Sequence, residues 1–247
     1  MKDKVAVAKV CMLAGKIMLE CGAETYRVED TMNRIAAAFG LHDAQSYATP
    51  TGINFSMDSS EATHFRRISH RSTDLHKIAE VNSISRKITA GELSVYEANL
   101  LLNNVSEAKL TFPYWLQIIA AAFVSGSFTI MFGGSWPDFL PSFIAGGVGF
   151  AAMLGAEKIV EIRFIAEFFA SLIIGLASIL FITQGVGVDL DKIIIGAVMP
   201  LVPGLHITNA VRDLMAGHLV AGLSKGVEAV LTSFAIGAGV AVVLAFV

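Results

Sequence analysis

Five long apolar runs without a charged residue constrain the fold of this chain most: 112–135, 139–156, 168–188, 193–211 and 229–247. A helix needs about 20 mostly apolar residues to cross the hydrocarbon core of a bilayer, and each run is about that long. We therefore expect a bundle of five transmembrane helices, with spans at about 112–132, 139–156, 166–186, 191–211 and 227–247.

The composition divides the chain into two regions. The first 111 residues hold 13 of the 18 Lys and Arg residues and 13 of the 21 Asp and Glu residues. Charged residues make up 16% of the whole chain, against about 25% in soluble domains. We expect a cytoplasmic domain in residues 1–111 and a transmembrane domain in residues 112–247. The Lys and Arg residues of the connections place the N-terminus in the cytoplasm and the C-terminus outside.

The first region contains the apolar periodicity of four helices. Two amphipathic helices are predicted within residues 5–39, and two more at about 73–89 and 94–107. Ser94 and Glu97 have the spacing of a capping box, which marks the start of the last of them.

A small sheet is predicted between the two pairs of helices. Ile53, Phe55 and Met57 alternate with polar residues, which is the period of a half-buried strand. Turn residues flank this segment on both sides, so about three antiparallel strands are expected. The predicted fold is thus a membrane protein: a cytoplasmic α+β domain, with helices flanking a small antiparallel sheet, followed by a five-helix transmembrane bundle.

Two prolines interrupt the fourth predicted span. Pro200 and Pro203 each remove a backbone N–H that a continuous helix would use, and Gly204 adds backbone freedom. The interruption is expected to free the carbonyl groups of Gly196 and Met199. Transporters often bind substrate where a transmembrane helix is broken, so this is the predicted substrate-binding position.

Polar residues follow the break at helical spacing. Asn209 and Asp213 are four residues apart and share one helix face. Asn209 could donate a hydrogen bond to a substrate, Arg212 could hold a carboxylate, and Asp213 could take up a coupling proton or bind an α-amino group. The alternative is that this segment is a helix of a cytoplasmic loop. Glu167 is a further candidate for proton relay, whereas His206 is interpreted as a bystander.

Signals for enzyme chemistry are absent from the sequence. The histidines are scattered without metal-ligand spacing, and neither a phosphate-binding loop nor a nucleophile elbow is present. We therefore expect no catalytic residue, no metal and no other cofactor, and no nucleic-acid partner.

Two stretches resemble a known family. "MLAGKIMLECGAETYRVEDTMNRIAAAFGL" (Met12–Leu41) is similar to the opening signature of the threonine/serine exporter family, and "PLVPGLHITNAVRDLMAGHLVAGLSKG" (Pro200–Gly226) is similar to that family's hallmark in the membrane half. The resemblance covers essentially the whole chain. It implies secondary export of threonine, serine or other small carboxylate-bearing metabolites, driven by the proton gradient. Some relatives are linked instead to four-carbon dicarboxylates such as succinate.

The resemblance also implies a partner. Long members of the family carry a second membrane half, and split members place it in a separate protein. We expect this chain to be the larger subunit of a two-component exporter, or a half that self-assembles, in the cytoplasmic (inner) membrane of a bacterium. Two alternatives stay open: a membrane-anchored enzyme or sensor whose first domain carries the activity, and a channel.

Overall fold

The computed structural model describes residues 4–58, 62–108, 111–160 and 163–245. The chain divides into two compact units. The first comprises Met1–Leu110 with Leu205–Gly226, and the second comprises Thr111–Gly204 with Val227–Val247. Residues 205–226 thus belong with the first unit, although the sequence analysis had placed them in the membrane domain.

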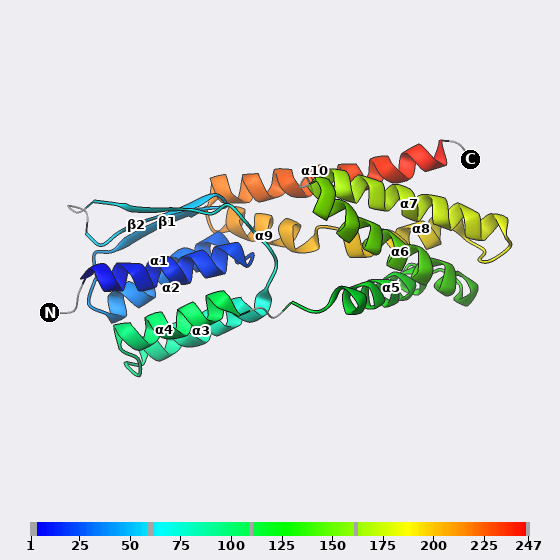
Figure 1. Ribbon diagram of the computed structural model, residues 1–247. Helices are drawn as coiled ribbons and strands as arrows, with labels where there is room; N and C mark the ends of the chain where they lie inside the picture. Colours follow the sequence, from blue (N-terminus) through cyan, green and yellow to red (C-terminus); the bar gives the residue numbers. More distant parts are fainter. Residues whose placement is uncertain (1–3, 59–61, 109–110, 161–162, 246–247) are drawn as a thin grey trace. The chain divides into compact units, whose positions relative to one another are not determined.

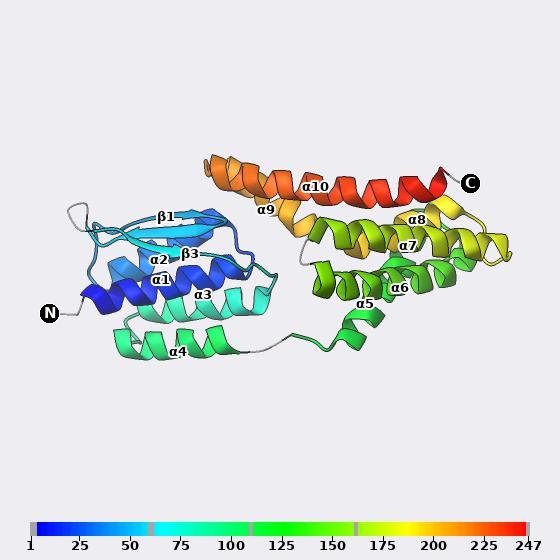
Figure 2. The same ribbon diagram turned by 45° about the horizontal axis from the view of Figure 1, so that its top comes forward.

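Four helices and three strands make up most of the first unit, in three layers (Figures 1 and 2). The sheet covers one side of helices α1 and α2, and helices α3 and α4 lie on the other side. The elements are α1 (Lys4–Glu20), α2 (Thr25–Ala38), β1 (Gln45–Thr49), β2 (Gly52–Ser56), β3 (His64–Arg67), α3 (Leu75–Thr89) and α4 (Val95–Glu107). All four predicted helices and the three strands are confirmed.

The strands form one antiparallel sheet in the order β1-β2-β3. Ile53 and Phe55 of β2 are fully buried, as the alternation predicts, and pack into one core with apolar residues of α1 and α2. The capping box at the start of α4 is also present: the Ser94 hydroxyl accepts the Glu97 N–H, and the Glu97 carboxylate accepts the Ser94 N–H. Local patterns therefore account for this part of the fold.

A tight turn joins α1 to α2 and is important for the site described below. Gly22 has a φ of 87°, a left-handed conformation that suits glycine. The Gly22 N–H donates to the Leu19 carbonyl and the Ala23 N–H donates to the Met18 carbonyl, which ends α1. The turn continues through Glu24, and α2 begins at Thr25.

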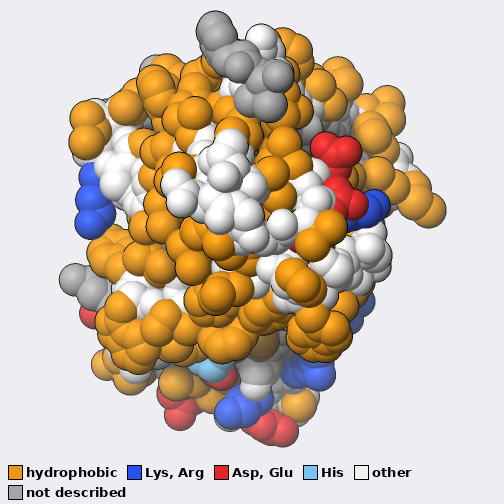
Figure 3. Space-filling view, turned by 90° about the vertical axis from the view of Figure 1, so that its right-hand side faces the viewer, with side chains coloured by type: hydrophobic (Ala, Val, Ile, Leu, Met, Phe, Trp, Pro, Cys, Tyr) orange, Lys and Arg blue, Asp and Glu red, His pale blue; other side chains and the backbone are white. Residues whose placement is uncertain are grey.

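The second unit is built from long apolar helices: α5 (Tyr114–Met131), α6 (Trp136–Val160), α7 (Arg163–Thr183), α8 (Leu190–Val198), the short 3-10 helix η1 (Met199–Leu201) and the later part of α10 (Leu219–Leu244). Large apolar side chains of these helices are exposed, among them Phe123, Phe169, Leu180 and Phe234. Hydrophobic side chains also predominate on the face seen in Figure 3. This is the surface expected of helices that contact lipid.

Four helices among the described residues are long and apolar enough to cross a membrane: α5, α6, α7 and α10. A fifth span is possible only if Leu190–Leu201 and Gly204–Met215 are counted together as one bent pair. The fourth predicted span, 191–211, is therefore not one helix but α8, η1 and the start of α9 (Gly204–Met215). The protein is mostly helical with four to five candidate spans.

Small and hydroxyl-bearing residues bring α5, α6 and α8 close together. A side chain added at Gly196 of α8 would place its Cβ 1.9 Å from the Thr129 hydroxyl of α5. The Ser125 hydroxyl donates to the Ala197 carbonyl at 3.3 Å, and the Thr129 hydroxyl donates to the Ser142 hydroxyl at 2.6 Å. Close backbone approach and interhelical hydrogen bonds are typical of helix packing in membranes.

Candidate functional site

The proline break reorganises the backbone without leaving the two carbonyl groups unpaired. The Met199 N–H donates to the Gly196 carbonyl, and the Val202 N–H donates to the Met199 carbonyl at 3.2 Å. The prediction that both carbonyls are free is therefore wrong, because a 3-10 turn replaces the bonds that Pro200 and Pro203 remove. Gly204 begins α9 on the far side of the break.

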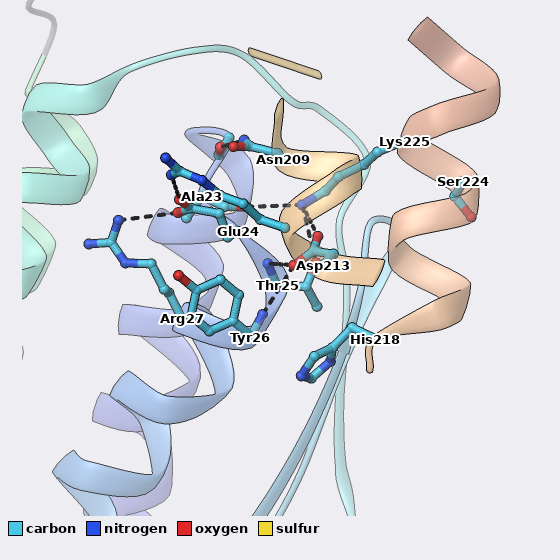
Figure 4. A network of polar contacts seen from close by, with 12 residues as sticks. Ala23, Glu24, Thr25, Tyr26, Arg27, Asn209, Asp213, His218, Ser224 and Lys225 are labelled. Atoms are coloured by element: carbon cyan, nitrogen blue, oxygen red, sulfur yellow. Dashed lines mark hydrogen bonds and ion pairs between the residues drawn. The ribbon is translucent and has the colours of Figure 1, made fainter. Parts of the chain in front are cut away.

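All three polar residues predicted on α9 contact the turn between α1 and α2. The Asn209 amide donates to the Gly22 carbonyl at 2.9 Å. The Arg212 guanidinium donates to the Glu24 carboxylate at 2.5 Å. The two segments are nearly 190 residues apart in the sequence and lie side by side in Figure 4. Their side chains are thus held by protein partners.

The carboxylate of Asp213 caps the start of α2. Its Oδ1 atom accepts the Thr25 N–H at 2.8 Å and the Tyr26 N–H at 3.4 Å. The residue at the cap position itself, Glu24, makes no side-chain capping bond. Asp213 is fully buried, and a negative charge at a helix N-terminus is stabilising because it faces the unpaired N–H groups and the positive end of the helix dipole.

A buried lysine completes this arrangement. The Lys225 ammonium lies 2.7 Å from Oδ2 of Asp213 and also donates to the Ala23 carbonyl at 3.1 Å and to the Thr25 hydroxyl at 3.2 Å. Its side chain is only 7% exposed. All three donors of the ammonium group are used, which a buried charge requires.

We call these contacts the α9 network. It comprises the side chains of Glu24, Thr25, Asn209, Arg212, Asp213 and Lys225 with the backbone of Gly22, Ala23 and Tyr26. The sequence reasoning found its three members on α9 but missed the others. One signal was available: Lys225 is the only Lys or Arg residue of α10, a predominantly apolar helix.

Glu24 is held as a carboxylate by its cationic neighbours. Burial raises the pKa of this carboxyl group. Its own backbone N–H and the guanidinium groups of Arg212 and Arg27 lower the pKa by more than burial raises it, so the pKa lies below the usual value. The Arg27 contact measures 3.2 Å. The Glu24–Arg212 pair therefore adds a second charged link between the turn and α9.

A separate acid–base pair lies one helical turn further along α2. The Glu29 carboxylate accepts the Ala48 N–H of β1 at 2.7 Å, and its Oε1 atom lies 3.6 Å from Nδ1 of His218. Burial raises the pKa of Glu29, and the nearby negative charge of Asp213 acts in the same direction. The Ala48 N–H and His218 oppose this rise without cancelling it.

The last predicted residue, Glu167, lies in α7 of the second unit and is fully buried. It therefore belongs to a different unit from Asp213. Within the described part of the chain, no group of three or more His, Cys, Asp or Glu side chains is arranged to hold a metal ion.

The fold and the site together define a class: a helical protein with several candidate membrane spans in one unit and, in the other, an α+β fold held to α9 by a buried polar network. Comparison with known proteins identifies the family. The model of the putative threonine/serine exporters matches residues 9–247, and the chain belongs to this family.

The most similar relatives have related names. A probable threonine/serine exporter of Mycobacterium tuberculosis is 23% identical over 93% of this chain and 44% of its own length. The probable succinate transporter subunit YjjP of Escherichia coli is 26% identical over 97% of this chain and 94% of its own length. The threonine/serine exporter of Corynebacterium glutamicum is 23% identical over 96% of this chain and 51% of its own length. No solved structure matches the chain significantly.

These names point to a transporter and not to an enzyme. The two stretches that carry the family resemblance, Met12–Leu41 and Pro200–Gly226, are also the two that supply every residue of the α9 network. The motif residues thus contact one another.

Proposed function

We propose that this protein is a subunit of a secondary transporter that exports small carboxylate-bearing metabolites, either threonine/serine-type amino acids or four-carbon dicarboxylates. Export is driven by the proton gradient and proceeds by alternating access. Family membership and the names of the relatives support transport. The carboxylate is the chemical feature that threonine, serine and succinate share.

We assign the predicted site residues to two roles. Pro200, Pro203 and Gly204 form the break at which substrate binds, because transporters often bind substrate where a transmembrane helix is interrupted. Asn209, Arg212 and Asp213 are coupling residues that transmit a change at the break to the α1–α2 turn. Glu167 of α7 is a candidate proton relay. Ionisable side chains are energetically costly among membrane helices, and those that occur there commonly mark ion or proton pathways.

The observation that supports this assignment best is the α9 network itself. Asp213 and Lys225 form a buried ion pair that also bonds the backbone of residues 23–26. Because α9 begins directly after the break, any displacement of α9 must either move the turn or break these bonds. Two arrangements of such a network would give the discrete states that alternating access requires.

The lengths of the relatives support a partner subunit. The chain spans only about half of the two threonine/serine exporters, but almost the whole length of a protein named as a transporter subunit. We propose that a separately encoded second membrane half, or a second copy of this chain, completes the transporter. We also propose that it is a multi-pass protein of the bacterial inner membrane, with the N-terminus in the cytoplasm and the C-terminus outside.

Transport can be tested in proteoliposomes that contain the full chain with and without its candidate partner. Efflux of labelled serine, threonine and succinate is measured with and without an imposed pH gradient. We expect gradient-dependent movement of at least one of the three, strongly reduced in Asn209→Ala and Asp213→Asn. The control Arg34→Ala changes only an exposed pair with Asp30 and should transport normally.

Three results would count against the proposal. Movement of none of the three solutes contradicts the substrate class. Flux that does not depend on the gradient favours a channel. Normal transport by Asp213→Asn and Asn209→Ala removes the coupling role of the α9 network.

A further inference from the structure

We infer that Glu29 and His218 form the proton-binding site of the first unit, and that Asp213, which is bonded to Lys225 and to the start of α2, is a structural partner beside it. This inference rests on the proposed function in one respect, namely that export is coupled to protons. It assigns the proton to two residues that the sequence analysis had not proposed as site residues, although both lie in the stretches that resemble the family.

Asp213 is fully engaged by other partners. Three N–H donors point at its two oxygens: the backbone N–H groups of Thr25 and Tyr26, and the ammonium of Lys225 at 2.7 Å. Removing either member of this buried pair would leave the other charge unpaired, which is strongly unfavourable. We therefore assign Asp213 a structural role.

Glu29 is placed differently. Its carboxylate has one backbone donor, the Ala48 N–H, and one side-chain partner, His218. That contact, at 3.6 Å, is longer than the 2.7 Å contact between Asp213 and Lys225. The buried negative charge of Asp213 disfavours a second negative charge close by. Burial acts in the same direction, so the pKa of Glu29 lies above its usual value, and we assign the proton to this carboxylate.

The groups that act on Glu29 come from three elements. Glu29 interacts electrostatically with His218, just before α10, and with Asp213 of α9; the strand β1 contributes the Ala48 N–H. The pair is thus controlled by the same two helices that form the α9 network.

The geometry also connects the pair to Asp213. The His218 N–H donates to the Asp213 backbone carbonyl at 2.9 Å, and Gly217, with a φ of 85°, provides the sharp turn between α9 and α10. On the other side, Glu29 lies one helical turn after Thr25 on α2. A change of charge on Glu29 or His218 can therefore act on α9, through the Asp213 carbonyl, and on the start of α2, which the Asp213 carboxylate contacts.

The experiment has two readouts on the full chain, one of which needs no transport. Infrared titration of the protein in lipid nanodiscs detects the carboxylic-acid band that appears on acidification. We expect Glu29→Gln to lose a band that Asp213→Asn and the neighbouring surface control Asp30→Asn both keep. Glutamine can still accept the Ala48 N–H, so this variant should fold.

The second readout is the pH profile of export. We expect the midpoint to shift by about one pH unit, or the profile to flatten, in Glu29→Gln and in His218→Gln, with Asp30→Asn unchanged. Loss of the band in Asp213→Asn but not in Glu29→Gln would overturn the inference, as would unchanged profiles in both Glu29→Gln and His218→Gln. If the wild type moves no solute while its band depends on Glu29, the proposed function fails and this proton site stands.

Discussion

Replacing Lys225 with methionine tests whether the Asp213–Lys225 pair holds α9 to the start of α2. Methionine keeps most of the apolar volume but removes all three donors, so Asp213 is left fully buried without a counter-ion. Removing one partner of a buried ion pair destabilises by about 3–5 kcal/mol. At about 1.4 kcal/mol per factor of ten, amide exchange at Thr25 and Tyr26 should accelerate by roughly two to three and a half orders of magnitude.

The assay is hydrogen–deuterium exchange of the full chain in nanodiscs, followed in peptides that cover residues 22–28. Lys16→Met is the matched control, because Lys16 pairs with Glu20 at 3.6 Å on a partly exposed face of α1. Such pairs contribute about 0–1 kcal/mol, so exchange should change by less than tenfold. The double variant Asp213→Asn with Lys225→Met should recover much of the loss, since it leaves no unpaired charge and asparagine can still accept the Thr25 N–H.

Two outcomes would refute this reasoning. If Lys225→Met exchanges at residues 22–28 no faster than Lys16→Met, the ion pair does not stabilise the turn. If the double variant is as unstable as the sum of the single variants, the two side chains do not interact energetically, and the 2.7 Å contact has no stabilising role.

Three further predictions concern other parts of the molecule. Gly196→Ala should destabilise the second unit by about 1–3 kcal/mol, because the added Cβ meets the Thr129 hydroxyl at 1.9 Å. The control Gly155→Ala, whose added Cβ has no neighbour within 4 Å, should be tolerated. Thermal unfolding of the two variants in detergent tests this difference. Ser94→Ala should cost about 1 kcal/mol through loss of the capping box, measured as faster exchange at the start of α4. Glu24→Gln should lower the melting temperature at pH 7, and the difference should shrink below pH 4.5, because a lowered pKa gives stability that is lost on acidification.

Local patterns in the sequence were sufficient for most of the first unit. The alternation around Ile53 and Phe55 predicted a strand with one buried face, and the structure has it. The Ser94–Glu97 spacing predicted a helix start that is present within one residue. These features depend on neighbours within a few positions, so one sequence contains the whole signal.

The partners of the α9 residues could not be predicted in the same way. Asn209, Arg212 and Asp213 bond to atoms 187 or 188 positions away, and no periodicity links such segments. The sequence analysis did not single out Lys225, because the last span was expected to start near residue 227, whereas α10 starts at Leu219. Because α10 begins at Leu219, Lys225 lies on a helix and not in a loop.

The partners of the α9 side chains change the interpretation of the break after α8. In a lipid-exposed helix, Arg212 and Asp213 would be energetically costly unless they faced a cavity or one another. From the sequence alone, this cost favours a binding cavity beside them. Both side chains are instead satisfied by the α1–α2 turn within the first unit. Their presence is thus explained without a cavity, and the case for substrate contact rests on Pro200, Pro203 and Gly204. Substitutions on α9 should therefore impair coupling more than substrate affinity, which a comparison of maximal rate with half-saturating concentration would separate.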